Sequence, residues 1–273
     1  EASGLPQTLI GHHRAHASAL AGEYPDVRDW IVFTWDGVGL GDDGTLWGGE
    51  TFTGGPGRWR RRASLRPFRL PGGEAAGRAP WRAAAGLLWE AGLSALFAPD
   101  ALHAAWQRGL NSPATHAIGR LFDAAAALTG LCSQASFEGE GPMLLEAAAR
   151  AGAAPPTGTP LPLVEAAHDL LHIDWEPLLP MLRDTAHSAA ARAARFHADL
   201  AASLRAVAER LRADTGIADV GLTGGVFQNA LLCELAVAEL TGAGFRVHLA
   251  RQVPMNDAGL SFGQIIEHLF SHA

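Results

Sequence analysis

The segment from Ile31 to Glu50 constrains the fold more than any other part of the sequence. An apolar run, Ile31 to Trp35, is followed by a stretch rich in Gly and Asp and by a second strand-like run that ends at Glu50. This pattern predicts a β-hairpin with Asp36 at its mouth. Gly37, Gly39 and Gly41 permit positive φ and allow backbone N–H groups to approach an anion. The hairpin therefore favours a phosphate site over simple packing.

Composition indicates an ordinary globular protein. The 273 residues are 48% hydrophobic and 18% charged, enough to bury a substantial core, and we expect a single domain over 1–273. A net charge of −7 argues against a broad nucleic-acid footprint. The one basic cluster, Arg58 to Arg62, is interpreted as a solvated strand edge whose charge discourages edge pairing.

Cysteine usage and hydropathy indicate the cellular setting. Cys132 and Cys233 lie far apart, so they predict neither a disulfide framework nor a cysteine-based zinc site, and a reducing, cytoplasmic location is favoured. The sequence has no 18-residue apolar run, and its start does not resemble a signal peptide. We therefore expect no segment that spans or enters a membrane.

A proline-free, alanine-rich segment within residues 7–22 predicts a helix that carries His12 and His16. These residues are four apart, so both imidazoles project from one helix face and could bind one metal ion. The alternative is that two histidines on a small-residue helix serve packing only.

The middle of the chain changes from strands to helices. Trp59 to Phe68 predicts a third strand, and helical spacing of apolar residues predicts long helices from Pro80 to about Leu131 and from His187 to Ala213. Between them, 153–162 has the composition of a linker, and Trp175 to Pro180 begins the last helical block.

The last part of the chain alternates between strands and helices. Ala218 to Thr223 predicts a strand that leads through a Gly224–Gly225 turn into a helix ending near Leu240. A strand at 245–249 follows, and Asn256 or Asp257 should cap the final helix. The order β-β-β, a helical insertion at about 80–215, then β-α-β-α predicts a ribonuclease-H-like α/β mixed sheet with helices on both faces.

Such a sheet should bring several chemical groups to one edge. Ligands of open α/β sheets bind beyond strand carboxyl ends, where Asp36, the Gly224–Gly225 turn and Asp257 should meet. Taken separately, the turn could serve packing and Asp257 could be a helix cap. With His12 and His16 they form a two-His, two-carboxylate set that suits Fe(II) or Zn(II) better than Mg(II).

The order of these motifs resembles a known family, the carboxy-terminal Kae-like domain of HypF-type carbamoyltransferases. These are [NiFe]-hydrogenase maturation proteins, similar in this domain to tobramycin carbamoyltransferase and to TsaD-type tRNA threonylcarbamoyl transferases, with an actin-like (ASKHA) fold. The resemblance covers nearly the whole chain. It is carried by His12 to Ala17, Trp35 to Glu50, Pro71 to Glu74, Pro80 to Arg82, Gly119 to Ala124, Phe137 to Gly139, Gly224 to Asn229, and Asn256 to Asp257.

The resemblance implies an activity and roles for the residues. The family domain binds carbamoyl-AMP, made from ATP, beside a metal and transfers the carbamoyl group to the carboxy-terminal cysteine of HypE. It implies metal ligands (His12, His16, Asp36, Asp257), glycines facing the phosphates (Gly37, Gly39), a ribose segment (Gly119, Asp123), and an adenosine and phosphate turn (Gly224, Gly225, Asn229). His13 is a candidate for proton transfer or substrate contact; the alternative is a packed or solvent-facing histidine.

Departures from the family define further expectations. We expect the chain to be a truncated, second half of the family domain, with one wall of the nucleotide cleft missing and with the carbamoyl-AMP-forming domain acting in cis or in trans. Alternatives to an active carbamoyltransferase are a non-catalytic nucleotide-, metal- or HypE-binding module and a structural remnant that forms a homodimer. Smaller departures from the family pattern are Ala79, His116 and Ala258.

Overall fold

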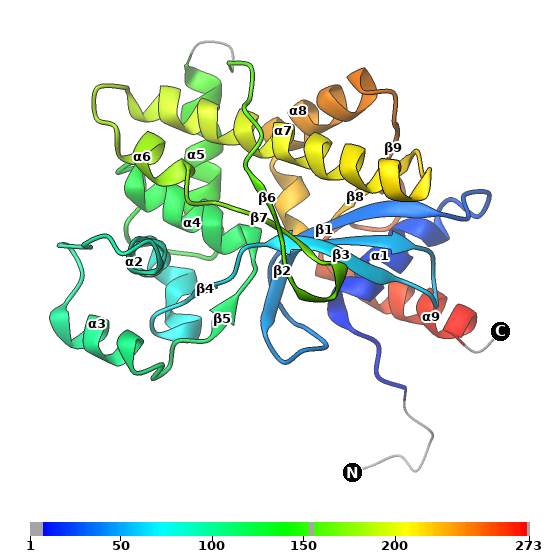
Figure 1. Ribbon diagram of the computed structural model, residues 1–273, viewed down its shortest axis with the longest axis horizontal. Helices are drawn as coiled ribbons and strands as arrows, with labels where there is room; N and C mark the ends of the chain where they lie inside the picture. The colour runs from blue at the N-terminus through cyan, green and yellow to red at the C-terminus, as the bar shows by residue number, and fades with distance from the viewer. Residues whose placement is uncertain (1–7, 153–155, 272–273) are drawn as a thin grey trace.

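A computed structural model describes residues 8–152 and 156–271, and within them a nine-stranded mixed sheet forms the centre of the fold (Figure 1). The main path of the sheet has the order β6-β7-β3-β2-β1-β8-β9. Its strands are β1 (Trp30–Leu40), β2 (Leu46–Gly54), β3 (Arg60–Leu65), β6 (Leu163–Glu165), β7 (Leu171–Ile173), β8 (Asp219–Thr223) and β9 (Arg246–Leu249), and the short strands β4 (Phe68–Arg69) and β5 (Ala114–Thr115) join beside β2.

The helices lie on both faces of this sheet, as predicted. In Figure 1, α7 and α8 run along one face, whereas α1 and α9 lie on the other. The described helices are α1 (His12–Gly22), α2 (Pro80–Glu90), α3 (Asp100–Gln107), α4 (Ile118–Leu128), α5 (Glu140–Ala151), α6 (Leu178–Arg183), α7 (Ala189–Thr215), α8 (Ala230–Gly242) and α9 (Leu260–Ser271).

Strand β1 is an interior strand of the sheet, and its side chains contribute to both cores. It pairs antiparallel with β2 and parallel with β8. Because successive side chains of a strand point to opposite faces, Phe33 and Trp35 enter the larger core, while Trp30 and Val32 enter the smaller core beneath α1. Burial on both faces explains why the segment reads as a continuous apolar run.

Two predictions about the middle of the chain were wrong in detail. The predicted long helix from Pro80 to Leu131 is three separate helices, α2, α3 and α4, with β5 between the last two. The region predicted as a helical insertion also contains β6 and β7, which extend the sheet beyond β3. Each of these strands has only three residues, too few to show an alternating pattern. The extent of the insertion, about 80–215, and the single-domain assignment stay predictions.

The basic cluster lies on a part of β3 that is paired on one side only. Residues 60, 61 and 63 pair with β2, whereas β7 pairs on the other side only with residues 63–65, so the prediction of a strand edge agrees with the pairing at 60–62. Three arginines of the cluster also form ion pairs: Arg58 with Asp29, Arg61 with Asp43 and Glu50, and Arg62 with Asp214. The charge is therefore largely compensated within the protein.

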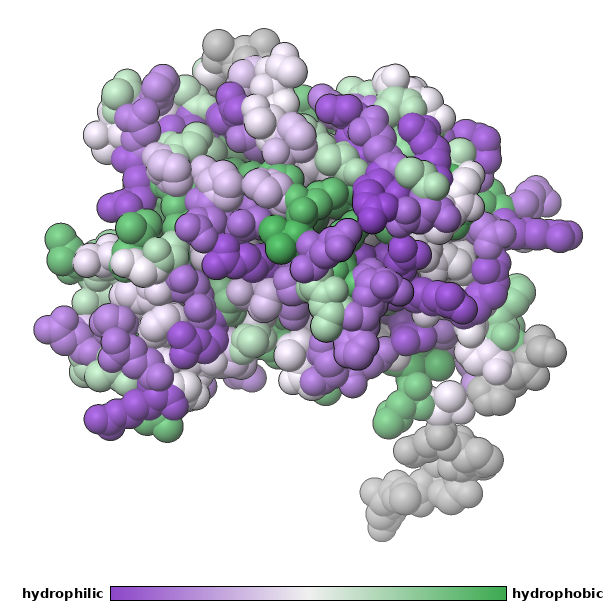
Figure 2. Space-filling view, viewed as in Figure 1, coloured by the Kyte–Doolittle hydropathy of each residue, from purple (hydrophilic) through white to green (hydrophobic). Residues whose placement is uncertain are grey.

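The surface is mixed. On the face shown in Figure 2, hydrophilic residues predominate and apolar residues gather in small separate groups. Ile265, Leu269 and Phe270 of α9 are each more than half exposed, and exposed apolar residues of this kind are what the homodimer alternative requires. Within 8–152 and 156–271, no helix combines the length and the apolarity needed to cross a membrane.

Helix α1 packs closely against α9 at Gly263. A Cβ on Gly263 would lie 1.9 Å from the carbonyl oxygen of Ala15, so only glycine allows the two helices to approach this closely. The contact holds the helix that carries His12 and His16 against its neighbours.

We predict that Gly263→Ala lowers the free energy of unfolding by roughly 1–3 kcal/mol, because the added methyl group forces α1 and α9 apart. Urea denaturation followed by circular dichroism measures this change. The matched control is Gly242→Ala, since a Cβ at this exposed helical position meets no atom within 4 Å. Equal stability of the two variants would contradict the prediction.

Candidate functional site

The first two components of the site come from α1. The helix begins at His12, directly after Gly11, and places His12 and His16 on one face. The His16 side chain is 1% exposed and that of His12 20% exposed, so His16 faces the interior and His12 lies at the rim. The predicted helix and the shared face are therefore confirmed.

Asp36 comes from an irregular part of β1 and not from the hairpin turn. The register of β1 with β2 shifts between Trp35 and Gly39, whereas the chain reverses at residues 41–45. The hairpin is confirmed, but the predicted position of Asp36 at its mouth is wrong. Gly39 lies beneath the histidines, where a Cβ would be 2.7 Å from His12 Cδ2, so β1 reaches α1 only because this residue is glycine.

Asp257 reaches the site from the loop after β9. The side chain of Asn256 accepts a hydrogen bond from the backbone N–H of Ala258 and caps the 3-10 turn Asp257–Gly259 that leads into α9, which leaves the Asp257 carboxylate available. The loop is anchored by the carboxylate of Glu23, which accepts hydrogen bonds from the backbone N–H groups of residues 251, 252 and 253. Glu23 follows α1 directly, so one helix positions ligands from two segments.

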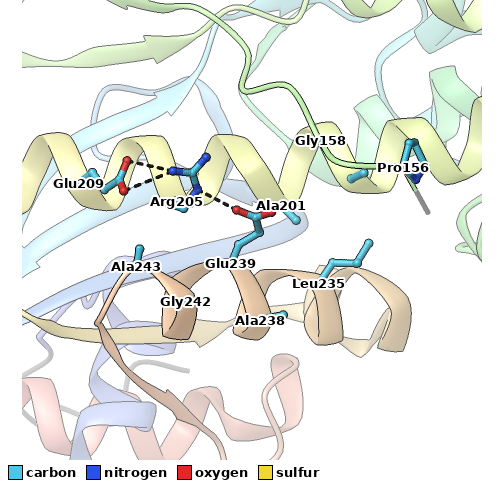
Figure 3. A pocket seen from close by; sticks show the side chains of 11 residues that line it. Pro156, Gly158, Ala201, Arg205, Glu209, Leu235, Ala238, Glu239, Gly242 and Ala243 are labelled. Atoms are coloured by element: carbon cyan, nitrogen blue, oxygen red, sulfur yellow. Dashed lines mark hydrogen bonds and ion pairs between the residues drawn. The ribbon is translucent and has the colours of Figure 1, made fainter. Parts of the chain in front are cut away.

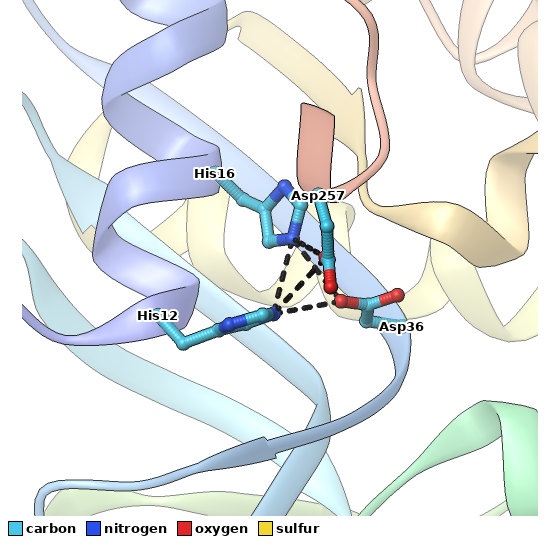
Figure 4. A group of neighbouring side chains, drawn as sticks. All are labelled: His12, His16, Asp36 and Asp257. Carbon is cyan, nitrogen blue, oxygen red and sulfur yellow. Dashed lines mark hydrogen bonds and ion pairs between the residues drawn. The ribbon is translucent and has the colours of Figure 1, made fainter. Parts of the chain in front are cut away.

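These four side chains point to a common centre (Figure 4). His12 Nε2 lies 2.9 Å from Asp36 Oδ2, 3.2 Å from His16 Nε2 and 3.5 Å from Asp257 Oδ1, and His16 Nε2 lies 3.1 Å and 3.3 Å from the same two oxygens. These five separations are close to the edges, about 3.3–3.4 Å, of a tetrahedron whose corners are about 2.0–2.1 Å from its centre, the distance expected for zinc bound to N and O ligands. The residues present therefore fit a divalent cation.

Electrostatics agree with a cation-binding function. Burial by itself would raise the pKa of Asp36, but hydrogen bonds with His12 and His16 outweigh it and hold that pKa far below its usual range. Burial would likewise lower the pKa of His16, but Asp257 and Asp36 raise it to about 9. The two carboxylates therefore stabilise positive charge at the centre of the cluster, and a metal ion would supply that charge.

A cavity of about 790 Å³ borders this cluster. Gly225 donates its backbone N–H to Asp36 Oδ1 at 3.1 Å, which ties the Gly-Gly turn to the cluster. A Cβ on Gly119 would be 2.7 Å from Gly37 Cα, so the start of α4 packs directly on β1. Six of the residues to which the resemblance gives a role in the site line this cavity: Asp36, Gly37, Gly119, Gly225, Asn229 and Asp257.

Three other candidates lie outside the cavity lining. Gly39 faces the histidines, and Gly224 has φ 101° and would bring a Cβ to 2.2 Å from the Trp35 carbonyl oxygen, so it serves close packing. Asp123 is buried against Arg120, 3.1 Å from its Nη2. Their nucleotide-binding roles stay predictions.

His13 is buried behind the cluster. Its ring lies 5.9 Å from that of Trp47, and its Nε2 lies 3.8 Å from Glu50 Oε2. Burial lowers the pKa of His13 to about 3, and neither ring nitrogen has a hydrogen-bond partner within the described part of the chain. This position agrees with the packed alternative, and proton transfer by His13 stays a prediction.

Some residues of the cavity were not singled out from the sequence. Arg120, Phe122 and Glu138 line it, although they belong to two segments that carried the family resemblance, Gly119–Ala124 and Phe137–Gly139. Their position within these segments was the sequence feature that could have identified them as cavity residues.

A second hollow, of about 520 Å³, lies between α7 and α8 (Figure 3). Its charged residues pair with one another, since Arg205 lies 2.7 Å from Glu239 and 3.3 Å from Glu209. With its charges satisfied internally, this hollow lacks the converging ligand atoms found beside Asp36.

Comparisons with known proteins identify the class to which this fold and site belong. The family model described as "Carbamoyltransferase, Kae1-like Domain, second subdomain" matches residues 32–264. Carbamoyltransferase HypF2 of Cupriavidus necator is 37% identical over 293 residues, and carbamoyltransferase HypF of Rhodobacter capsulatus is 39% identical over 277. A HypF homolog of Cupriavidus necator is 36% identical and is covered over 70% of its length. The chain belongs to the HypF carbamoyltransferase family.

Solved structures confirm the fold. A full-length HypF in a phosphate- and nucleotide-bound form aligns with 98% of this chain at a TM-score of 0.87 and 28% identity. HypF of T. kodakarensis aligns with 96% at a TM-score of 0.79. The predicted Kae-like, ribonuclease-H-like α/β class is thus confirmed. The chain spans 36% of the length of HypF2 and of the Rhodobacter protein.

We predict that Asp257→Ala weakens Zn(II) binding by more than about tenfold, because losing even a supporting residue of a metal site costs that much. Asp257 suits the test because its side chain is 68% exposed, so the fold should tolerate the change. Calorimetric titration with a competing chelator measures affinity. The control is Asp26→Ala, also exposed, and equal affinities would count against the metal centre.

A second prediction concerns pH. Burial raises the pKa of Glu50 from its ordinary value of 4.5 to about 7, despite the opposing effect of Arg61. Between these values the folded protein retains a proton that the unfolded chain releases, so this group's contribution to the free energy of unfolding falls as pH rises through that window. Glu50→Gln should therefore flatten the pH dependence of stability from about 4.5 to 7 in urea titrations. The exposed control Glu74→Gln should leave it unchanged.

Proposed function

We propose that this protein transfers a carbamoyl group from carbamoyl-AMP to the carboxy-terminal cysteine of a HypE-type partner, during assembly of the cyanide ligands of [NiFe]-hydrogenase. The observation that carries the proposal is the contact between a four-ligand cluster and a glycine-lined cavity, joined by the hydrogen bond from Gly225 to Asp36, in a chain of the HypF family.

The cavity suits an adenylated ligand. A HypF relative is described in a phosphate- and nucleotide-bound form, which supports a nucleotide here as well. Gly37 and Gly225 border the cluster end of the cavity. Their N–H groups both donate to Asp36 Oδ1, so what they would offer a phosphate is close approach to the backbone, because neither carries a side chain. Asn229 lines the cavity, and its Oδ1 caps α8 by accepting from the N–H of Leu232. Its Nδ2 lies 3.0 Å from His197 Nε2, so contacts within the protein fix this side chain in the cavity wall.

The metal ligands in this proposal are His12, His16, Asp36 and Asp257, and the ion is Fe(II) or Zn(II), with Mg(II) the alternative brought by ATP. When bound, such an ion supplies Lewis acidity toward the phosphate or the carbamoyl oxygen. The side chains themselves fix its position, because His16 and Asp36 are buried and hydrogen-bonded to each other.

The transfer is a balanced acyl substitution. The partner's sulfur forms a bond with the carbamoyl carbon, and the bond from that carbon to the phosphate oxygen breaks. AMP leaves with the electron pair, and the thiol proton passes to solvent. The contribution of the chain is to hold the adenylate with its carbamoyl end at the cluster. The carbamoyl-AMP-forming domain would act in cis or in trans.

We predict that the protein, given carbamoyl-AMP and a peptide with the HypE carboxy-terminal sequence, carbamoylates the terminal cysteine, as detected by mass spectrometry. Asp257→Ala should slow the transfer by about 100-fold or more, comparable with losing one charge-stabilising group in an acyl-transfer site. Asp26→Ala serves as control, since Asp26 is exposed and belongs neither to the cluster nor to the cavity lining.

Two outcomes would contradict the proposal. One is the absence of transfer even when the remaining domains of a HypF protein are added. The other is transfer that Asp257→Ala leaves unchanged. Binding of ATP without transfer would support the binding-module alternative, and a dimer without nucleotide binding would support the structural remnant.

A further inference from the structure

The charge distribution of the cavity raises the question of what holds an anion in it. Four carboxylates line it: Asp36, Asp257, Glu138 and Glu146. Among the lining residues that the structure describes, Arg120 is the only basic one. Apart from a metal ion, Arg120 is thus the side chain whose charge would attract an anionic ligand.

Arg120 is buried and only partly satisfied. It lies in the first turn of α4, next to Gly119, and is 5% exposed. Its Nη2 is 3.1 Å from Asp123 Oδ2, but its Nε has no hydrogen-bond partner in 8–152 and 156–271. Burial raises the pKa of Asp123 to about 7, so this carboxylate is not a full counter-charge near neutral pH. The guanidinium therefore retains capacity for a second anionic partner.

Glu138 holds that second position loosely. Its side chain is 75% exposed, and its Oε1 lies 3.5 Å from Arg120 Nη2. The same oxygen is 3.8 Å from the position that a Cβ of Gly37 would take, so it lies beside the residue that follows Asp36. Because the Glu138 carboxylate is exposed and must be held in place by a single 3.5 Å contact, it is a weak partner for Arg120 that a better anion can displace.

We propose that Arg120 binds the phosphate of a nucleotide in this cavity and that the Glu138 carboxylate occupies this anion position until the ligand displaces it. The inference rests on the proposed function and adds a residue that selects phosphate-bearing ligands. Arg120 suits this role because its planar guanidinium can donate two parallel hydrogen bonds to phosphate oxygens. A purely structural Arg120 would only neutralise Asp123 and would not distinguish nucleotides from nucleosides.

The test compares AMP with adenosine by isothermal titration calorimetry. Glu138→Gln should tighten AMP binding by about fivefold, the effect of removing one like charge at close range in a solvated site. Arg120→Gln should weaken AMP binding by about tenfold or more, since a charge-assisted contact is lost. Neither variant should change adenosine binding. Arg120→Lys should retain part of the AMP affinity, because lysine keeps the positive charge but cannot donate two parallel hydrogen bonds to phosphate.

The control is Glu165→Gln, which removes an exposed carboxylate on β6. If Arg120→Gln does not fold, Glu138→Gln alone decides the matter. The proposal is overturned if Glu138→Gln weakens AMP binding or leaves it unchanged, if adenosine binding shifts as much as AMP binding, or if the unaltered protein binds no AMP. Intact AMP selectivity with no carbamoyl transfer would overturn only the proposed function.

Discussion

The candidate site depends on how closely α1 can approach its neighbours. On one side Gly39 lets β1 pass beneath the histidines, and on the other Gly263 lets α9 pack against the backbone of α1. A third glycine, Gly221 of β8, would bring a Cβ to 2.5 Å from Leu20. A side chain at any of these positions would move the helix outward. Because ligand atoms must converge to within a few tenths of an ångström, this spacing determines whether a cluster exists at all.

Charge is the second constraint, and it acts at two neighbouring places in the cavity. In the cluster, Asp36 and Asp257 face two imidazoles, and the two carboxylates are neutralised only if the imidazoles carry protons or a cation binds. Beside the residue that follows Asp36, Arg120 shares its charge between buried Asp123 and exposed Glu138. Both places therefore contain charged groups that are only partly compensated, which is typical of ligand-binding sites.

Much of the fold and part of the site could be predicted from sequence, because both rest on local pattern. The four-residue spacing of His12 and His16 determines that they share a face once a helix forms. The alternating strands and helices after residue 218 likewise give the parallel pairing of β8 with β9. The three-residue strands β6 and β7 and the inner position of β3 depend on pairing between distant segments, which no local pattern contains.

The same distinction holds within the site. The carboxylate of Asp257 is brought to the histidines by the contacts of Glu23 with the 251–253 backbone, and nothing in the sequence near Asp257 indicates this. Asp36 leaves the regular pairing of β1 with β2 because the register of the two strands shifts there. The Gly- and Asp-rich residues of the hairpin turn gave no sign of this shift, so the predicted position of Asp36 was wrong. Arg120 stood within a segment already of interest, but its role depends on burial and on the partner it meets across the cavity.

The four ligands come from opposite ends of the described chain, His12 from its first helix and Asp257 from the segment before its last. An ion held by them would act as a removable cross-link that closes a loop of nearly the whole polypeptide. Such closure restricts the unfolded chain, and binding to the folded state alone adds stability in proportion to the logarithm of ion concentration. Unfolding of the segment that leads into α9 would then release the ion. Occupancy of this one site would therefore report whether the two ends of the described chain are packed together.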